Sequence, residues 1–155
     1  MKKKISIILP YKEIYSENFA GAASIWLKDY DKLSTLSNQT IIYGNLDKNF
    51  KPLTKNFKNI KILNTPFSKT KSYINYFYND YLKYQFEIIE IHNRPEYLNF
   101  LIKKNVQSKL IFFFHNNPQD IRGSKTTNER LNILENTDKV FFVSAWTKKK
   151  FFEDL

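Results

Sequence analysis

Two near-copies of one short motif constrain the fold of this chain more than any other feature. His92 opens the sequence HNRP directly after the apolar run EIIEI, and His115 opens HNNP directly after LIFFF. Both runs have the composition of buried strands, and the spacing between them fits one helix plus one strand. Two such strands are expected to lie parallel and side by side, with their carboxyl ends at one edge of a sheet. The sequence therefore predicts that both histidines face one crevice at that edge.

Short apolar runs alternate with segments of helical periodicity, which is typical of an α/β fold. We expect a single Rossmann-like domain, a doubly wound, mostly parallel sheet of about six strands with helices on both faces. The expected strands are Lys4–Leu9, Thr40–Tyr43, Ile60–Leu63, Phe86–Ile91, Lys109–Phe114 and Lys139–Val143. The expected helices are Gly21–Leu36, Thr70–Lys83, Pro95–Lys104, Thr126–Asn136 and Ala145–Leu155. The polar stretch Asn45–Asn59 is expected to be a surface excursion.

Composition and charge narrow the class of protein. With 155 residues, 42% of them hydrophobic and 17% aromatic, the chain can bury the core of one domain and is too apolar for a disordered segment. The net charge of +10 favours an anionic partner such as a nucleic acid, a sugar nucleotide or an acidic lipid surface, although an ordinary basic surface explains it equally well. The absence of cysteine excludes disulfides and thiolate chemistry.

The amino-terminal sequence MKKKISIILP superficially resembles a signal peptide. Its apolar part, Ile5–Leu9, is shorter than the ~7–15 residues that a signal peptide needs, so we assign it to the first strand. No run approaches the ~18 apolar residues of a membrane span. We therefore expect a cytoplasmic protein, and the lysine clusters Lys2–Lys4 and Lys148–Lys150 leave open a peripheral contact with the inner membrane face.

Several motifs that identify other chemistries are absent from the sequence. It contains neither GxGxxG, nor GxxxxGK followed by Ser or Thr, nor GxSxG, which excludes the dinucleotide fingerprint, the phosphate-binding P-loop and the hydrolase nucleophile elbow. A metal site could use His92, His115 and Glu90, with Asp120 farther off on a loop. Because Glu90 lies on a strand that we expect to be buried, we expect no metal.

The two histidines admit a structural and a functional interpretation. A single histidine at a strand end is more often satisfied by local hydrogen bonds. Two histidines in equivalent contexts at neighbouring strand ends favour a binding crevice instead. Each neutral imidazole and each asparagine amide supplies both a donor and an acceptor, which suits a hydroxyl-rich ligand.

The segment HNNPQDIRGSKTTNER after Phe114 is longer than the ~2–6 residues that such a connection needs. Arg122 beside Gly123 can clamp a phosphate or a carboxylate. An ordinary polar loop with a Ser or Thr helix cap is the alternative, and we favour ligand contact. Glu129 and Arg130 are expected to be an exposed pair on the next helix.

Four segments occur in order along the chain: ILPYKEIYSENFAGAASIWLKDY, EIHNRPEY, FFHNNPQDIRGSKTTNER and VFFVSAWTKKKFF. Together they resemble the amino-terminal half of a GT-B glycosyltransferase of the family 4 type, closest to bacterial enzymes that make lipopolysaccharide or other surface glycans. The resemblance implies two Rossmann-like domains facing a cleft and a nucleotide-sugar donor held mainly by the carboxyl-terminal domain. It also implies retaining transfer of a hexosyl group to a glycan or lipid-linked acceptor, with no obligatory metal or other cofactor.

The resemblance also implies roles for individual residues. His115 would contact the transferred sugar and is the expected catalytic residue. Gly21 and Ala22, at a helix N-terminus, would approach the donor diphosphate through backbone N–H groups. The other expected donor-side residues are Asn116, Arg122 and Gly123. The expected acceptor-side residues are Glu90, His92, Asn93 and Arg94.

One departure from the family matters most: the carboxyl-terminal donor-binding domain, with its paired glutamates, is absent from these 155 residues. The last expected helix runs to Leu155 without a glycine or proline stop, so we expect a fragment, a split gene product or a binding remnant that is inactive alone. The expected partners are then the donor, the acceptor and the missing domain, with no nucleic acid. The rival interpretation is a non-catalytic α/β module that binds an anionic ligand or nucleic acid.

Overall fold

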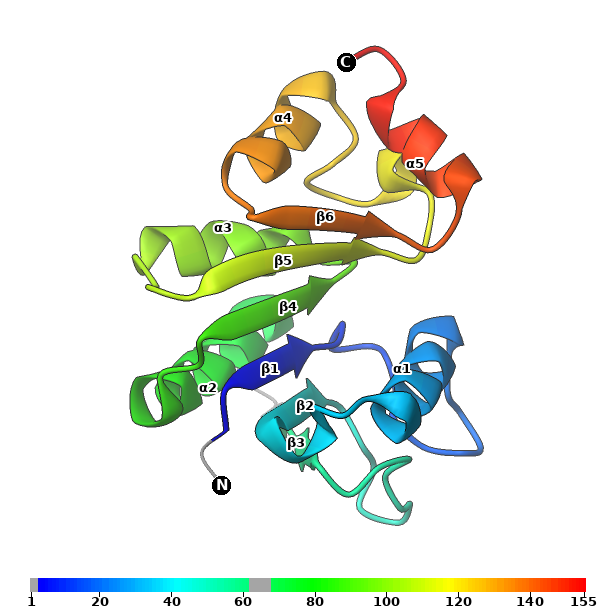
Figure 1. Cartoon of the computed structure of the whole chain (residues 1–155), viewed down its shortest axis with the longest axis vertical. Helices are drawn as coiled ribbons and strands as arrows, with labels where there is room; N and C mark the ends of the chain where they lie inside the picture. Colours follow the sequence, from blue (N-terminus) through cyan, green and yellow to red (C-terminus); the bar gives the residue numbers. More distant parts are fainter. Residues whose placement is uncertain (1–2, 62–67) are drawn as a thin grey trace.

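The computed structural model describes residues 3–61 and 68–155 and contains a six-stranded parallel sheet with the order β3-β2-β1-β4-β5-β6 (Figure 1). The strands are β1 (Ile5–Ile8), β2 (Thr40–Gly44), β3 (Phe57–Asn59), β4 (Ile88–His92), β5 (Lys109–Phe114) and β6 (Lys139–Phe142). The α-helices are α1 (Ala22–Leu33), α2 (Lys69–Tyr84), α3 (Pro95–Lys103), α4 (Thr127–Glu135) and α5 (Ala145–Phe152). Two short 3-10 helices are η1 (Ser37–Gln39) and η2 (Pro118–Asp120).

The chain builds the sheet outward from its centre in two directions. β1 pairs in parallel with both β2 and β4, and the segment containing α2 returns the chain from β3 to the far side of β1. The direction of winding therefore reverses between β1 and β4. In open parallel sheets, ligands bind outside the carboxyl ends of the strands at this reversal. The predicted doubly wound, Rossmann-like fold is confirmed.

The helices cover the two faces of the sheet unequally (Figure 1). On one face, α2, α3, α4 and α5 pack over a large core that includes Phe112 and Phe151. On the other face, α1 covers a smaller core over β1 and β2, where Leu27 packs with Ile7. Phe141 lies on this second face of β6 and is 44% exposed. This face is therefore open over the β4–β6 half of the sheet.

The edge strand does not lie where the sequence predicted it. The strand at Ile60–Leu63 was expected, but β3 is formed by Phe57–Asn59, inside the stretch expected to be a surface excursion. Phe57 pairs with Ile42 and stacks on Tyr15 with ring centroids 4.8 Å apart. Ile60 is fully buried and donates one backbone hydrogen bond to Gly44, while Ile62 and Leu63 lie outside the described residues. Ile60 is therefore buried without belonging to a strand, because burial and strand pairing are different properties.

The HNRP motif ends β4 for identifiable local reasons. Asn93 has a positive φ of 52°, a conformation that asparagine tolerates better than most residues, and it turns the chain out of the strand. Pro95 then occupies the first position of α3, where its missing N–H has no helical partner to lose. After β5, the side chain of Asn117 accepts a hydrogen bond from the backbone of Gln119 and starts η2. Both histidines are thus held directly at strand ends.

Candidate functional site at the ends of β4 and β5

The parallel pairing of β4 and β5 brings the two histidines into contact. His92 is the last residue of β4 and pairs with Phe113, two residues before His115. The ring centroids of the histidines are 4.9 Å apart, and Nδ1 of His92 lies 2.9 Å from Nε2 of His115. At this distance one nitrogen donates a hydrogen bond and the other accepts it. The predicted meeting of the two histidines at one sheet edge is confirmed. The expectation that both face a crevice is wrong for His92, because its side chain is completely buried.

The two imidazoles lie at different depths among aromatic rings. His92 is completely buried, whereas His115 is partly exposed. Phe113 stacks on both, with ring centroids 5.2 Å from His92 and 4.8 Å from His115. Trp26 of α1, which the sequence analysis did not single out, lies 5.7 Å from His115 between ring centroids. Of the two histidines, His115 is therefore the one placed to touch a ligand.

The environment of His115 keeps its ring uncharged. Burial, together with the neighbouring His92, lowers the pKa of His115 from 6.5 to about 3. Burial has this effect because an imidazolium inside the protein loses its hydration. At neutral pH the ring consequently offers one N–H donor and one lone pair.

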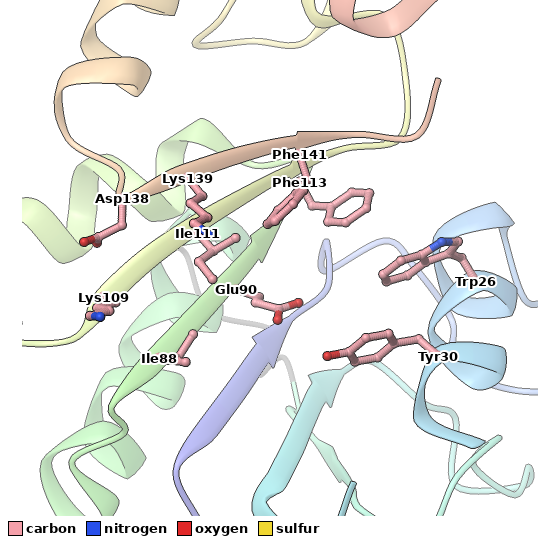
Figure 2. Close-up of a pocket in the computed structure, with 10 residues that line it drawn as sticks. All are labelled: Trp26, Tyr30, Ile88, Glu90, Lys109, Ile111, Phe113, Asp138, Lys139 and Phe141. Carbon is pink, nitrogen blue, oxygen red and sulfur yellow. The ribbon is translucent and has the colours of Figure 1, made fainter. Parts of the chain in front are cut away.

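Glu90 lies on the same face of β4 as His92, and its carboxylate extends from the strand toward Tyr30 (Figure 2). Its Oε2 atom lies 3.7 Å from Nε2 of His92. Burial raises the pKa of Tyr30, and the negative charge of Glu90 adds to this effect. Glu90 also lines a cavity of about 690 Å³ on the open half of the sheet. The other residues lining it are Trp26, Tyr30, Ile88, Lys109, Ile111, Phe113, Asp138, Lys139 and Phe141 (Figure 2).

Asn93 forms hydrogen bonds within the fold, and Arg94 lies over an aromatic ring while its buried Nε has no hydrogen-bond partner. The Oδ1 atom of Asn93 accepts the backbone N–H of His115 at 2.8 Å, and its own backbone N–H donates to the carbonyl of Phe113 at 3.0 Å. These bonds fix the ends of β4 and β5 relative to each other. Arg94 is the N-cap of α3, and its guanidinium lies 5.6 Å from the ring centroid of Tyr11. The expected acceptor-side residues are therefore neighbours, and the side chain of Asn93 stabilises the fold through its hydrogen bond to His115.

The N-terminus of α1 contains the expected donor residues and one that the sequence analysis missed. Gly21 is the N-cap and Ala22 the first helical residue. The carboxylate of Glu13 lies in front of them, and its Oε1 accepts the backbone N–H of Ser24 at 3.1 Å. A Cβ added to Gly21 would lie 2.5 Å from the same oxygen, so glycine leaves room for this approach. Glu13 thus occupies a position where helix N–H groups and the helix dipole would also favour a phosphate.

The loop after β5 separates its three expected donor-side residues. Asn116 is exposed next to His115. Arg122 lies against the start of α3, where its Nε is 3.4 Å from Oε1 of Glu96 while 85% of its side chain stays exposed. Gly123 has a φ of 88°, which disfavours any side chain, and it packs against Pro95. Asn116 accordingly stays beside the histidines, whereas Arg122 and Gly123 make their contacts with α3.

The expectation that Glu129 and Arg130 form an exposed pair is wrong. Arg130 is 2% exposed, and its guanidinium donates to the carbonyl oxygens of Lys125 at 2.8 Å and Glu153 at 2.7 Å. Glu129 instead completes a capping box with Thr126. The buried guanidinium joins the loop before α4 to the end of α5, a tertiary contact that local sequence does not encode.

A metal site was considered at Glu90, His92 and His115. In the structure the two imidazoles form a hydrogen bond with each other. Across residues 3–61 and 68–155, no group of three His, Cys, Asp or Glu side chains is placed to hold a metal ion. Within the described part of the chain, no helix combines the length and apolar character needed to cross a membrane.

Comparison with known proteins supports the fold. No protein-family model and no curated protein matches the sequence. Among solved structures, the chain is similar to sucrose-phosphate synthase from Thermosynechococcus elongatus, with a TM-score of 0.58 and 13% sequence identity. The similarity covers 90% of this chain and 42% of that chain, so this chain spans less than half the length of the relative. The chain therefore has the Rossmann-like fold of one half of a GT-B architecture.

The lowered pKa of His115 predicts a loss of stability in acid. Between pH 6.5 and about 3 the histidine of the unfolded chain binds a proton that the folded ring does not. The unfolded state then holds more protons, so the free energy of unfolding falls as the pH decreases through this window and is insensitive to His115 above it. Urea unfolding at pH 7 and pH 5 should show a smaller acid-induced loss for His115→Gln than for the wild type. Equal losses in the two proteins would contradict the assigned ionisation state.

Proposed function

We propose that the chain is the acceptor-side half of a glycosyltransferase that moves a sugar from a nucleotide-sugar donor to a glycan or lipid-linked acceptor. The observation that carries the proposal is the uncharged, partly exposed His115 at the carboxyl end of β5, in contact with the end of β4. This is the edge where parallel sheets bind ligands. The likeness of the fold to part of a sucrose-phosphate synthase supports the same assignment.

In this proposal His115 is the catalytic residue. A neutral imidazole can hydrogen-bond a hydroxyl of the transferred sugar, or a charge that develops during transfer, without a metal ion. The exposed amide of Asn116 adds a donor and an acceptor beside it. The acceptor is proposed to bind beside Glu90, Asn93 and Arg94. His92 is fully buried, so it supports this side without touching the acceptor. The proposed reaction transfers a hexosyl group with retention of configuration, as the sequence resemblance implies.

The donor diphosphate is proposed to bind at the N-terminus of α1, beside Gly21 and Ala22. To do so it would displace the carboxylate of Glu13 from the helix end. The largely exposed Arg122 is able to close over a phosphate because its ion pair with Glu96 is solvated and weak. Gly123 would allow the backbone of that loop to come close. The nucleotide base would be held by a second Rossmann-like domain outside these 155 residues, so we expect the chain alone to be inactive.

We further propose that the protein belongs to glycosyltransferase family 4 and acts in the cytoplasm on bacterial surface glycans such as lipopolysaccharide. Sugar nucleotides are cytoplasmic, which is the setting the reaction needs. The lysines at 148–150 would favour peripheral contact with anionic lipid by about 1 kcal/mol for each residue at the membrane surface.

A non-catalytic module that binds an anionic ligand or nucleic acid is the rival proposal, and the net charge of +10 is compatible with both proposals. The two proposals differ in their dependence on salt. Binding to nucleic acid weakens steeply as salt rises because counterions are released, whereas hydrogen bonding to a sugar does not. A steep salt slope together with tight binding to DNA or RNA would support the rival.

His115→Ala tests the proposed catalytic role in the complete enzyme, that is, this chain with its donor-binding domain. We expect kcat to fall about 10²-fold, because the variant loses the group that hydrogen-bonds the reacting sugar. The variant should also lose about 1–3 kcal/mol of stability, since the buried His92 loses its partner. The rate is therefore expressed per folded molecule, with the folded fraction taken from urea unfolding. Unchanged turnover per folded molecule would make His115 a structural residue and refute the assignment.

Glu13→Gln tests the proposed donor site. Removing the carboxylate charge that occupies the N-terminus of α1 should raise the affinity for inorganic pyrophosphate about fivefold, as measured by isothermal titration calorimetry. The matched control is Glu17→Gln, which removes the same charge from an exposed side chain of the same segment. If both variants have the same effect, general electrostatics explains it, and the donor assignment at α1 is wrong.

A further inference from the structure

Three side chains form a line from the open cavity to the sheet edge. Glu90 and His92 are two residues apart in β4, so their side chains point to the same face of the sheet. His115 lies beside the end of that strand. Oε2 of Glu90 is 3.7 Å from Nε2 of His92, and Nδ1 of His92 is 2.9 Å from Nε2 of His115. The line connects a carboxylate at the cavity with an imidazole at the proposed sugar site.

The middle member of the line is isolated from solvent. The side chain of His92 is 0% exposed, and its Nε2 atom is buried without a hydrogen-bond partner. The distance of 3.7 Å to Glu90 is too long for a hydrogen bond, yet short enough for a strong electrostatic effect in a buried setting. The carboxylate therefore determines whether a hydrogen or a lone pair on this nitrogen is favourable.

The charge of Glu90 selects one tautomer of His92. With hydrogen on Nε2, an N–H group faces the carboxylate and is attracted to it. With hydrogen on Nδ1, a lone pair on Nε2 would face the same negative charge. The favoured tautomer leaves a lone pair on Nδ1 of His92, which must then accept its hydrogen bond from Nε2 of His115. His115 thereby keeps its lone pair on Nδ1.

We infer that Glu90 is a positioning residue that acts through the buried His92 to hold His115 in a single tautomer, with the Nδ1 lone pair available to a ligand hydroxyl. Among residues 3–61 and 68–155, no hydrogen bond to Nδ1 of His115 is present. The inference rests on the proposed function, in which His115 contacts the sugar. It specifies that the sugar donates a hydroxyl hydrogen to His115, and it replaces the expected direct contact of Glu90 with the acceptor.

The side chains around Glu90, His92 and His115 do not favour a different tautomer of either imidazole. Trp26 of α1 and Phe113 of β5 contact the imidazoles with aromatic rings. Tyr30 of α1 lies toward Glu90, and burial together with that charge raises its pKa, so its hydroxyl stays protonated. Within the described part of the chain, Glu90 is the charged side chain in contact with His92.

Nitrogen-15 chemical shifts of the two imidazoles in the 155-residue chain measure the tautomers directly at neutral pH. In the wild type, both rings should carry hydrogen on Nε2 and show an unprotonated Nδ1. A hydrogen on Nδ1 of His115 in the wild type would overturn the inference. Because this spectrum is decisive by itself, the test does not depend on the folding of any variant.

Glu90→Gln then tests the cause. The variant keeps the shape of the side chain, removes its charge and adds an amide donor that can satisfy a lone pair on Nε2 of His92. Both rings should shift toward the opposite tautomer. The matched control is Glu87→Gln, at an exposed residue paired with Lys4 just before the same strand, and it should leave both rings unchanged. Imidazole shifts that do not move in a folded Glu90→Gln would also overturn the inference.

Kinetics of the complete enzyme separate the positioning role from direct contact. Glu90→Gln should lower kcat about tenfold with little change in the KM for the acceptor. A raised acceptor KM with unchanged kcat would mean that Glu90 touches the acceptor, and the inference would fail. The chemical shifts require neither sugar nor turnover, so failure of the tautomer assignment is distinguishable from failure of the proposed function.

Discussion

The parallel pairing of β4 with β5 is the constraint on which the site depends. Its register places His92 opposite Phe113, so His115 emerges beside the end of the neighbouring strand. The side chain of Asn93 then fixes the backbone of His115 with one hydrogen bond of 2.8 Å. Because β1 lies on the other side of β4, the helix that follows β1 brings Trp26 over the same edge. The β4–β5 register thus positions two imidazoles and an amide, and the pairing of β1 with β4 adds an aromatic ring.

The incomplete cover of the sheet explains how a carboxylate can lie on a central strand. Under a packed helix, the charge of Glu90 would be expensive to bury. Here its side chain is 14% exposed and borders the cavity, while His92 two residues later is fully enclosed. The strand therefore passes from a hydrated to a dry environment within two residues of one face. This gradient allows a charge near water to influence a buried imidazole.

Much of the fold could be predicted because apolar periodicity reports burial, and the central parallel strands are the most buried part of the sheet. β3 could not be predicted in the same way, since this short edge strand, with the sequence FKN, is only half-buried. The meeting of the two histidines followed from their positions at the ends of neighbouring strands. The capping of α1 by Glu13 and the burial of Arg130 could not be predicted, because they depend on tertiary contacts that a local pattern does not contain.

We propose a binding site for a sugar at the ends of β4 and β5. Amide and imidazole shifts of the labelled chain, titrated with UDP-glucose as a probe at low and high salt, test it most directly. Shifts centred on His115, Asn116 and Trp26 that persist at high salt are expected. Shifts confined to surface lysines such as those at 148–150, and abolished by salt, would contradict it.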